Sequence, residues 1–387
     1  METVHPSECG FDPRRIDHLA ASIKSDIERE QYDGAVVIVA RGGKVGLHEA
    51  MGFAERASGR TTRTDDVFCL FSVTKPITAT AIFSRVDRGE LALTTRVAEI
   101  IPEFASKGKH RVTVAQLLTH TAGMSAGFPP VPQELLGNLE AVVAAICDQG
   151  LDARPGETVS YSPITAYSIL GEVVRRVDGG ERSLRQILAD DIFTPLGMKD
   201  TALGVRSDLA ARKVPIVVRD RREGLFPPEV IEGFNTLLQA DAEIPGGGGV
   251  ATASDLFRFA EMLRRGGELD GARILSPAIV RLAATNHTGL QSNDLWNYAR
   301  EMRGWDEFPA FLGLGFFMRG TGICPTYLGS MASPGTFGGV GAGSTLFWID
   351  PERDVTFVCL TSGALEESYS MDRFQRLSDL VLAAVVD

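Results

Sequence analysis

The sequence predicts an α/β protein of the α+β type, with a mostly antiparallel sheet flanked by helices and an inserted helical subdomain. Apolar, strand-like runs occur near both ends of the 387-residue chain, at 34–40, 345–349 and 355–360. Helical periodicity dominates the stretch from about 135 to 200. A short turn at Gly42-Gly43 follows the first strand, and such hairpin connections favour antiparallel pairing.

The remaining elements are predicted from hydrophobic periodicity and from turn-forming residues along the chain. Residues 205–245 are rich in charge and proline, so we expect loops there. Either Thr252 or Ser254 is placed to cap the helix after the Gly246–Gly249 run. We expect helices at 11–31, from Ser72 to Gly89, and at 112–120, 134–148, 164–178, 183–193, 255–265 and 371–386, and a second strand at 44–51. We therefore assign a sheet domain to 1–90 and 245–387, and a mostly helical subdomain to 91–244.

Composition narrows the class of function. The net charge of −11 and the pI near 5.2 argue against nucleic acid and anionic membrane as partners. No apolar run approaches the roughly 18 residues that span a bilayer, and no signal peptide is visible in Met1–Glu8. The five cysteines are scattered and lack metal-ligand spacing, which suits reduced thiols in the cytoplasm. We expect a cytoplasmic protein without metal or cofactor; the composition leaves its oligomeric state open.

The stretch Phe71–Ala79 places a serine and a lysine on one face of a helix. Ser72 and Lys75 are three residues apart, and residues at that spacing are neighbours on a helix surface. Pro76 is tolerated if the helix begins near Ser72, because the first N–H groups of a helix have no intrahelical acceptor. The same start puts the serine at the positive end of the helix dipole. A desolvated, neutral lysine can serve as the base that activates a serine nucleophile.

Three other features are weaker candidates for a site. Ser125 lies in a G-x-S-x-G match, but a helix precedes it and prolines follow it, whereas a nucleophile elbow needs a strand before and a helix after. His287 is the only histidine downstream of it that fits the chain order of such a triad. His120 is expected to be structural, near a helix end. Gly246–Gly249 lacks the G-K-[ST] ending of a phosphate loop and is expected to be a close-packed turn beside the active-site edge.

A series of motifs gives the chain a family resemblance. It resembles class C β-lactamases and, more closely, the β-lactamase-fold esterases called family VIII carboxylesterases. The resemblance implies the serine β-lactamase/penicillin-binding-protein-like fold. The motifs that carry it are Phe71-Ser72-Val73-Thr74-Lys75-Pro76, Leu117-Leu118-Thr119-His120-Thr121-Ala122-Gly123-Met124, Pro155-Gly156 with Tyr161-Ser162, Pro195-Leu196-Gly197-Met198-Lys199-Asp200-Thr201, Gly247–Asp255 and Phe337–Gly343.

The resemblance also implies residue roles. Ser72 would be the nucleophile, Lys75 its base or proton relay, and Tyr161 a phenolate that takes the serine proton and later activates water. The backbone N–H groups of Ser72 and Ala342 would form the oxyanion hole. The strand Gly339-Val340-Gly341 would bind substrate.

Two departures from the family pattern change the expected substrate. Pro163 stands where the Y-x-N motif has asparagine, and Gly339 stands where the K-T-G motif has the lysine that pairs with a substrate carboxylate. We therefore expect a serine carboxylesterase that hydrolyses small, uncharged esters through an acyl-enzyme. An acyltransferase that passes the acyl group to an alcohol or amine, and a weak β-lactamase or D-aminopeptidase, remain alternatives. Seven aromatics between Trp296 and Phe317 are expected to pack in the core, with a fraction lining the substrate pocket.

Overall fold

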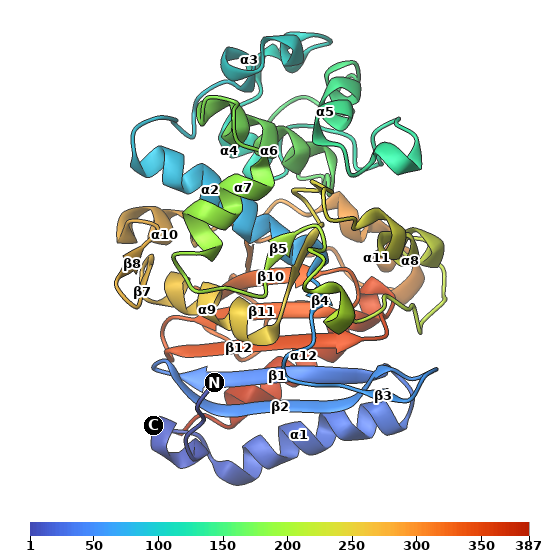
Figure 1. The fold of residues 1–387 in the computed structure, drawn as a ribbon, viewed down its shortest axis with the longest axis vertical. Helices are drawn as coiled ribbons and strands as arrows, with labels where there is room; N and C mark the ends of the chain where they lie inside the picture. Colours follow the sequence, from blue (N-terminus) through green and yellow to red (C-terminus); the bar gives the residue numbers. More distant parts are fainter. Residues whose placement is uncertain (387) are drawn as a thin grey trace.

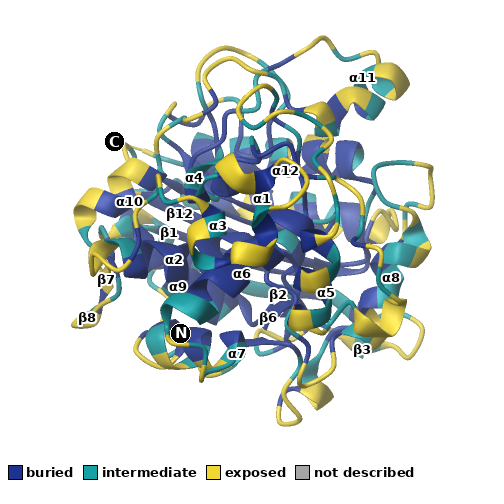
Figure 2. Ribbon diagram, turned by 90° about the horizontal axis from the view of Figure 1, so that it is seen from above, coloured by how far each residue is buried: buried dark blue, intermediate teal, exposed yellow. Residues whose placement is uncertain are grey.

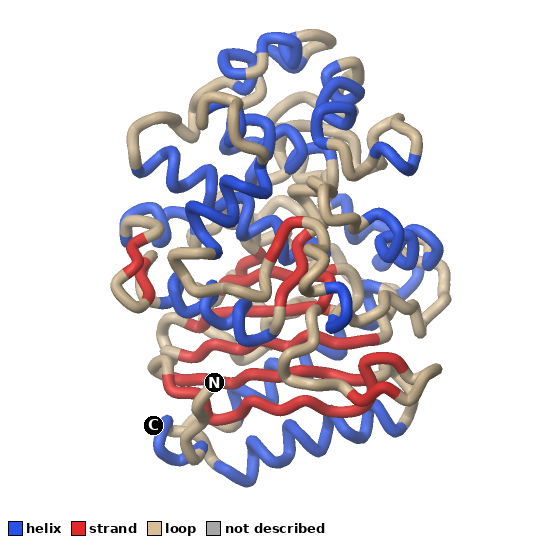
Figure 3. The backbone as a smooth tube through the Cα atoms, viewed as in Figure 1, coloured by secondary structure: helices blue, strands red, loops and turns tan. Residues whose placement is uncertain are grey.

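A seven-stranded sheet forms the base of the molecule (Figure 1, Figure 3). The computed structural model describes residues 1–386. The strand order is β3-β2-β1-β12-β11-β10-β9, and every neighbouring pair is antiparallel. The strands are β1 Gly34–Arg41, β2 Lys44–Glu55, β3 Arg60–Thr61, β9 Phe317–Met318, β10 Phe337–Gly341, β11 Thr345–Asp350 and β12 Val355–Ser362. β1 pairs with β12 along its whole length, so strands from the two ends of the chain meet inside one sheet, as expected.

Helices cover both faces of the sheet and fill the region above it (Figure 1). Their bounds are α1 Pro13–Glu28, α2 Thr74–Asp87, α3 Val97–Ile100, α4 Val114–Leu118, α5 Leu139–Cys147, α6 Thr165–Val177, α7 Leu184–Leu188, α8 Pro228–Leu237, α9 Ala253–Arg264, α10 Pro277–Ala283, α11 Asn297–Arg303 and α12 Glu367–Ala383. This arrangement confirms the predicted α/β class with an antiparallel sheet.

The alternation of side chains along β1 explains its uninterrupted apolar sequence. Val36 and Ile38 pack on the face that also holds core residues of α2 and α9. Val37 and Val39 point to the opposite face, where α1 and α12 supply the core. Successive residues of a strand face opposite sides, so a strand covered on both sides must be apolar throughout.

The helical part is organised around α6, which packs against α2, α4 and α5. Its residues from Thr165 to Val174 are all buried. Figure 2 shows that buried residues fill the middle of the molecule, whereas exposed ones lie on peripheral elements such as α8 and α10. One core cluster joins Val36 of the sheet to Leu170 of α6. The division of the chain at residues 90 and 245 stays a prediction.

A small second sheet brings the S-x-x-K segment beside the glycine run. It has the order β4-β6-β5, formed by Phe68–Cys69, Gly249–Ala251 and Ala202–Leu203. β4 pairs with β6 through Phe68↔Ala251 and Cys69↔Val250. Residues about 180 positions apart therefore lie side by side directly before Ser72.

The expectation of loops throughout 205–245 is wrong in part, because α8 lies within this stretch. Pro228 occupies the start of α8, where a missing N–H is harmless and the fixed φ suits a helix. Ile231 and Phe234 anchor the helix by burial. The cap of α9 is Thr252, whose side chain accepts a hydrogen bond from the Asp255 N–H. In residues 1–386, no helix combines the length and apolar character needed to cross a bilayer.

Candidate active site

Ser72 and Lys75 meet at the start of α2. Phe71–Val73 forms a 3₁₀ turn that leads into the helix, and Lys75 Nζ lies 2.8 Å from Ser72 Oγ. Phe71, directly before the serine, has a φ of +46°, in the left-handed region that residues with a side chain rarely adopt. Backbone strain of this kind is concentrated at functional sites, where the surroundings hold it in place. The predicted contact between the serine and the lysine is present.

The Lys75 amine is enclosed by the protein. Its side chain is buried, and Nζ donates a hydrogen bond to the Gly246 carbonyl at 2.6 Å. A Cβ atom on Gly246 would lie only 2.2 Å from the Pro163 carbonyl oxygen, so the glycine run is a close-packed turn beside the active-site edge, as expected. Burial lowers the pKa of Lys75 well below its ordinary 10.5. A neutral amine keeps one lone pair, which can accept the Ser72 hydroxyl proton.

Tyr161 adds a phenol to the same site. Its ring centroid lies 5.0 Å from Lys75 Nζ, and its side chain forms a hydrogen bond with Ser72. Burial raises the pKa of Tyr161 above its ordinary value, and the hydrogen bond with Ser72 offsets this only in part. The structure therefore favours a protonated phenol, in contrast to the phenolate that the resemblance implied. The physical reason is that burial removes the anion from water, and the neutral Lys75 amine supplies no positive charge to compensate.

His120 contributes more to the site than its sequence position suggested. It is buried with a φ of +56°, and its ring centroid lies 4.4 Å from that of Tyr161. The Ser162 N–H donates to His120 Nδ1 at 3.2 Å, which fixes the backbone directly after Tyr161. Burial, with Lys75 nearby, lowers the pKa of His120 well below 6.5. His120 thus acts as a neutral support for Tyr161, consistent with the expected structural role.

A narrow cavity joins these groups. Its wall consists of Ser72, Lys75, Pro76, Leu118, His120, Tyr161, Tyr167, Leu312, Gly315, Phe316, Phe317, Gly339 and Val340. The sequence had pointed to three of these as catalytic and to Gly339 and Val340 as substrate-binding. The sequence gives no signal for Tyr167, because only the tertiary fold brings α6 to Ser72, and only the fold shows which part of the aromatic 296–317 stretch reaches the cavity. A fraction of the seven aromatic residues between Trp296 and Phe317 was expected to line the pocket, and two of them, Phe316 and Phe317, line this cavity.

The end of β10 lies directly against the turn that carries Ser72. A Cβ atom on Gly341 would come within 2.2 Å of the Leu70 carbonyl oxygen and 3.1 Å of Phe71 Cβ. Ala342, the next residue, is the second expected oxyanion donor. The Thr345 hydroxyl of β11 donates to the Leu70 carbonyl at 2.9 Å and holds the two segments together. This close approach requires glycine at position 341.

Position 339 has glycine where the family motif has lysine, and packing requires glycine there. A Cβ atom at this position would lie 2.8 Å from the Phe347 ring and 3.0 Å from Pro76 Cγ. The space that a side chain would enter is therefore filled. Among the cavity-lining residues, Lys75 is the only lysine or arginine, and the rest of the wall is largely apolar.

Ser125 and its surroundings do not form a nucleophile elbow. Residues 121–130 form no strand or helix around it, and its hydroxyl accepts a hydrogen bond from the Gly127 N–H. His287 Nε2 is engaged with the Leu282 carbonyl at 2.9 Å. The local structure that the G-x-S-x-G motif needs is missing in this described stretch.

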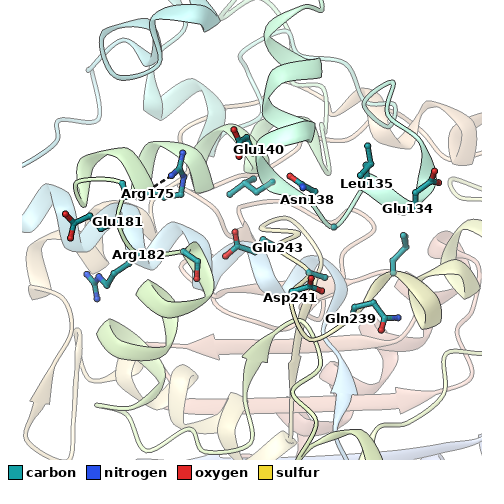
Figure 4. Close-up of a pocket in the computed structure, with 16 residues that line it drawn as sticks. Glu134, Leu135, Asn138, Glu140, Arg175, Glu181, Arg182, Gln239, Asp241 and Glu243 are labelled. Carbon is teal, nitrogen blue, oxygen red and sulfur yellow. Dashed lines mark hydrogen bonds between the residues drawn. The ribbon is translucent and has the colours of Figure 1, made fainter.

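A wider hollow of about 510 Å³ opens between α5, the start of α7 and the end of α8 (Figure 4). Its wall is dominated by charged residues, namely Glu134, Glu140, Arg175, Glu181, Arg182, Asp241 and Glu243. Arg175 is paired with Glu172, and Arg182 with Asp178. The hydroxyl of Ser183 caps α7 by accepting from the Gln186 N–H. The hollow shares no lining residue with the Ser72 cavity, and its arginines are already neutralised.

The fold and the site together define the class of protein. An antiparallel sheet with a helical insertion, and a serine and a buried lysine at the start of a helix packed on that sheet, form the framework of β-lactamase-fold hydrolases. The Beta-lactamase family model matches residues 19–380, so the chain belongs to the β-lactamase family.

Individual relatives span esterases and penicillin-binding proteins. Penicillin-binding protein 4 of Amycolatopsis lactamdurans is 32% identical over 336 residues, which cover 86% of this chain and 81% of that protein. Esterase/beta-lactamase LipL of Mycobacterium tuberculosis (strain ATCC 25618 / H37Rv) is 29% identical over 358 residues, which cover 84% of this chain and 76% of LipL.

Solved structures agree with this assignment. A penicillin-binding protein homolog from Caulobacter crescentus superposes with a TM-score of 0.80 at 28% identity, covering 97% of this chain and 99% of that one. A family VIII carboxylesterase superposes with a TM-score of 0.78 at 22% identity, covering 95% and 98%, a likeness that shows the fold. The predicted membership of the β-lactamase-like serine hydrolase superfamily is confirmed.

Proposed function

We propose that the protein is a serine carboxylesterase that cleaves small carboxylic esters through an acyl-enzyme on Ser72. The observation that carries the proposal is the 2.8 Å contact between Ser72 Oγ and the desolvated Lys75 Nζ. In the first half-reaction, Oγ attacks the ester carbonyl carbon while Nζ takes the hydroxyl proton. The backbone N–H groups of Ser72 and Ala342 receive the oxyanion. The leaving alcohol takes its proton from the Lys75–Tyr161 pair, and water later releases the carboxylic acid.

The proposed substrate is a neutral ester because of what the wall of the cavity offers. The family motifs place a lysine and an asparagine where this chain has Gly339 and Pro163; packing leaves no room for a side chain at position 339, and Pro163 has no side-chain amide. Apart from its hydroxyl, amine and imidazole groups, the wall of the Ser72 cavity is apolar and includes Leu118, Phe316 and Phe317. Such a wall favours a small, uncharged ester whose acyl and alcohol parts extend beyond the cavity, since the cavity itself has room for little more than one water molecule.

The experiment is intact-mass analysis after brief exposure to a p-nitrophenyl ester or a phosphonate, on the wild type and on Ser72→Ala and Ser125→Ala. We expect one covalent adduct on the wild type and on Ser125→Ala, and none on Ser72→Ala. An adduct lost in Ser125→Ala instead would overturn the assignment of the nucleophile. Nitrocefin is the companion substrate, and its turnover at a rate comparable with the ester would refute the argument from Gly339 and Pro163.

A further inference from the structure

Tyr167 carries a buried hydroxyl that the protein leaves unpaired. The residue lies in the first turns of α6 and is fully buried. Its Oη has no hydrogen-bond partner within residues 1–386. Buried tyrosine hydroxyls nearly always have a partner, because an unpaired buried polar group costs about 1–3 kcal/mol. The partner of this hydroxyl must therefore be a molecule other than the protein.

The position of Tyr167 identifies where that molecule lies. Tyr167 is part of the wall of the Ser72 cavity. Lys75 Nζ lies 5.3 Å from the Tyr167 ring centroid and 5.0 Å from that of Tyr161, so the amine stands beside both rings. On another side, a Cβ atom at Gly315 would lie 3.1 Å from Tyr167 Oη. Because Gly315 has no side chain, no Cβ atom crowds the hydroxyl from that side.

The cavity has the size and the lining that one water molecule needs. The space open to the centre of a water molecule is about 20 Å³. A single water requires roughly 10–15 Å³ by this measure, together with two to four polar partners. The wall supplies the Ser72 hydroxyl, the Lys75 amine and the phenols of Tyr161 and Tyr167. A water in this cavity would give the Tyr167 hydroxyl, which has no partner in the protein, a hydrogen-bond partner.

We propose that Tyr167 holds the water that hydrolyses the acyl-enzyme. This inference rests on the proposed function, since it requires an acyl group on Ser72. The Tyr167 hydroxyl accepts a hydrogen bond from one water O–H and so orients the water oxygen toward the acyl carbonyl carbon. A new C–O bond forms between water and that carbon, and the bond from the carbon to Ser72 Oγ breaks. The other water proton passes to Lys75 Nζ and from there to Oγ, which leaves a carboxylic acid and free serine.

Tyr167 positions the water and does not itself exchange a proton in this step. Burial raises the pKa of Tyr167 well above its ordinary value, so the phenol stays neutral at every pH of interest. The consequence is kinetic: acylation by the ester needs no water, whereas deacylation does. Loss of the Tyr167 hydroxyl should therefore lengthen the lifetime of the acyl-enzyme and let an added alcohol capture more of the acyl group.

The test compares Tyr167→Phe with the wild type in stopped-flow assays on p-nitrophenyl butyrate, with and without methanol. The control is Tyr327→Phe, which also removes a buried hydroxyl, one that donates to the Glu367 carbonyl and lies outside the Ser72 cavity. We expect Tyr167→Phe to keep the burst rate of acylation within about threefold and to slow deacylation at least tenfold. The ratio of methyl butyrate to butyric acid should rise at least tenfold. Tyr327→Phe should match the wild type in all three quantities.

The outcomes separate this inference from the function on which it rests. Deacylation at the wild-type rate in Tyr167→Phe would overturn the water site while leaving the Ser72 acyl-enzyme intact. Acylation and deacylation slowed to the same extent would overturn it too, because that pattern marks a structural role. If the wild type itself forms no acyl-enzyme, the proposed function fails first. If methanol restores the turnover of Tyr167→Phe, the water site is supported, because the same folded variant then completes the reaction with a different acceptor.

Discussion

The protonation state of Lys75 gives the sharpest test of the site. The amine is held inside the protein, where burial lowers its pKa well below 10.5. In the unfolded chain the same group is solvated and keeps its proton up to its ordinary pKa. Between the two pKa values the unfolded state therefore binds one proton more than the folded state. Lys75→Met removes this difference while keeping an unbranched side chain of similar length.

The sign and the size of the expected effect on the free energy of unfolding follow from the linkage between proton binding and folding. Where the unfolded state binds more protons, the free energy of unfolding rises with pH, by about 1.4 kcal/mol per pH unit for one proton. Lys75 therefore destabilises the folded state below pH 10.5; this cost grows as pH falls toward the folded-state pKa and vanishes above 10.5. The stability of the wild type relative to Lys75→Met should therefore rise with pH in the range below 10.5, by at most about 1.4 kcal/mol for each pH unit. Glu367, whose pKa burial raises to about 8, is present in both proteins and cancels.

The assay is urea unfolding followed by far-UV circular dichroism over this pH range. Ser72→Ala is the control, because it abolishes the reaction while retaining Lys75, and it should keep the wild-type slope. Lys75→Met should also lose about 10²–10⁴ in kcat, as expected for removal of a general base. Parallel pH curves for the wild type and Lys75→Met would mean that the folded protein holds an ammonium. That result would refute the neutral-amine mechanism even if the variant were inactive.

Two further predictions concern the supports of the site. His120→Leu leaves the Ser162 N–H without its acceptor and should lower the free energy of unfolding by about 1–3 kcal/mol in urea titrations. His120→Asn should lower it less, because asparagine can accept that hydrogen bond and tolerates a positive φ. Equal losses in both variants would argue against this contact. Ala342→Pro removes the second proposed oxyanion donor and should reduce kcat about 10²–10³-fold in steady-state ester assays, whereas Ala342→Gly, which keeps the N–H, should stay within tenfold. Equal activity of the two would exclude that N–H from the oxyanion hole.

The sequence predicts the part of the site that depends on local geometry. The contact between Ser72 and Lys75 follows from helical spacing, and the tight turn at Gly246 follows from glycine density beside a predicted helix cap. Tyr167 could not be found in this way, since it lies in the stretch of α6 from Thr165 to Val174 that is buried on all sides and whose facing partners come from distant segments. The same limit applies to the sheet: hairpins are visible as turns between apolar runs, whereas the position of β9 at the sheet edge depends on tertiary contacts. α8 is not predicted from composition, because proline disfavours a helix except at its first position, where Pro228 lies.

The neutrality of the resting site connects its chemistry to its substrate. A buried lysine and a buried tyrosine can share their protons as amine and phenol or as ammonium and phenolate, and the total charge is the same in both cases. Low-dielectric surroundings favour the neutral pair, because the desolvation of two ions exceeds their attraction. Charge then appears only when the Ser72 proton reaches Lys75 and the oxyanion forms, which concentrates electrostatic stabilisation in the transition state. A site that carries no charge in its resting state cannot form an ion pair with a substrate carboxylate, and Gly339 supplies no cation for one. Under the proposed function, the neutral amine that would activate the serine is thus also a reason to expect a neutral ester in preference to a β-lactam.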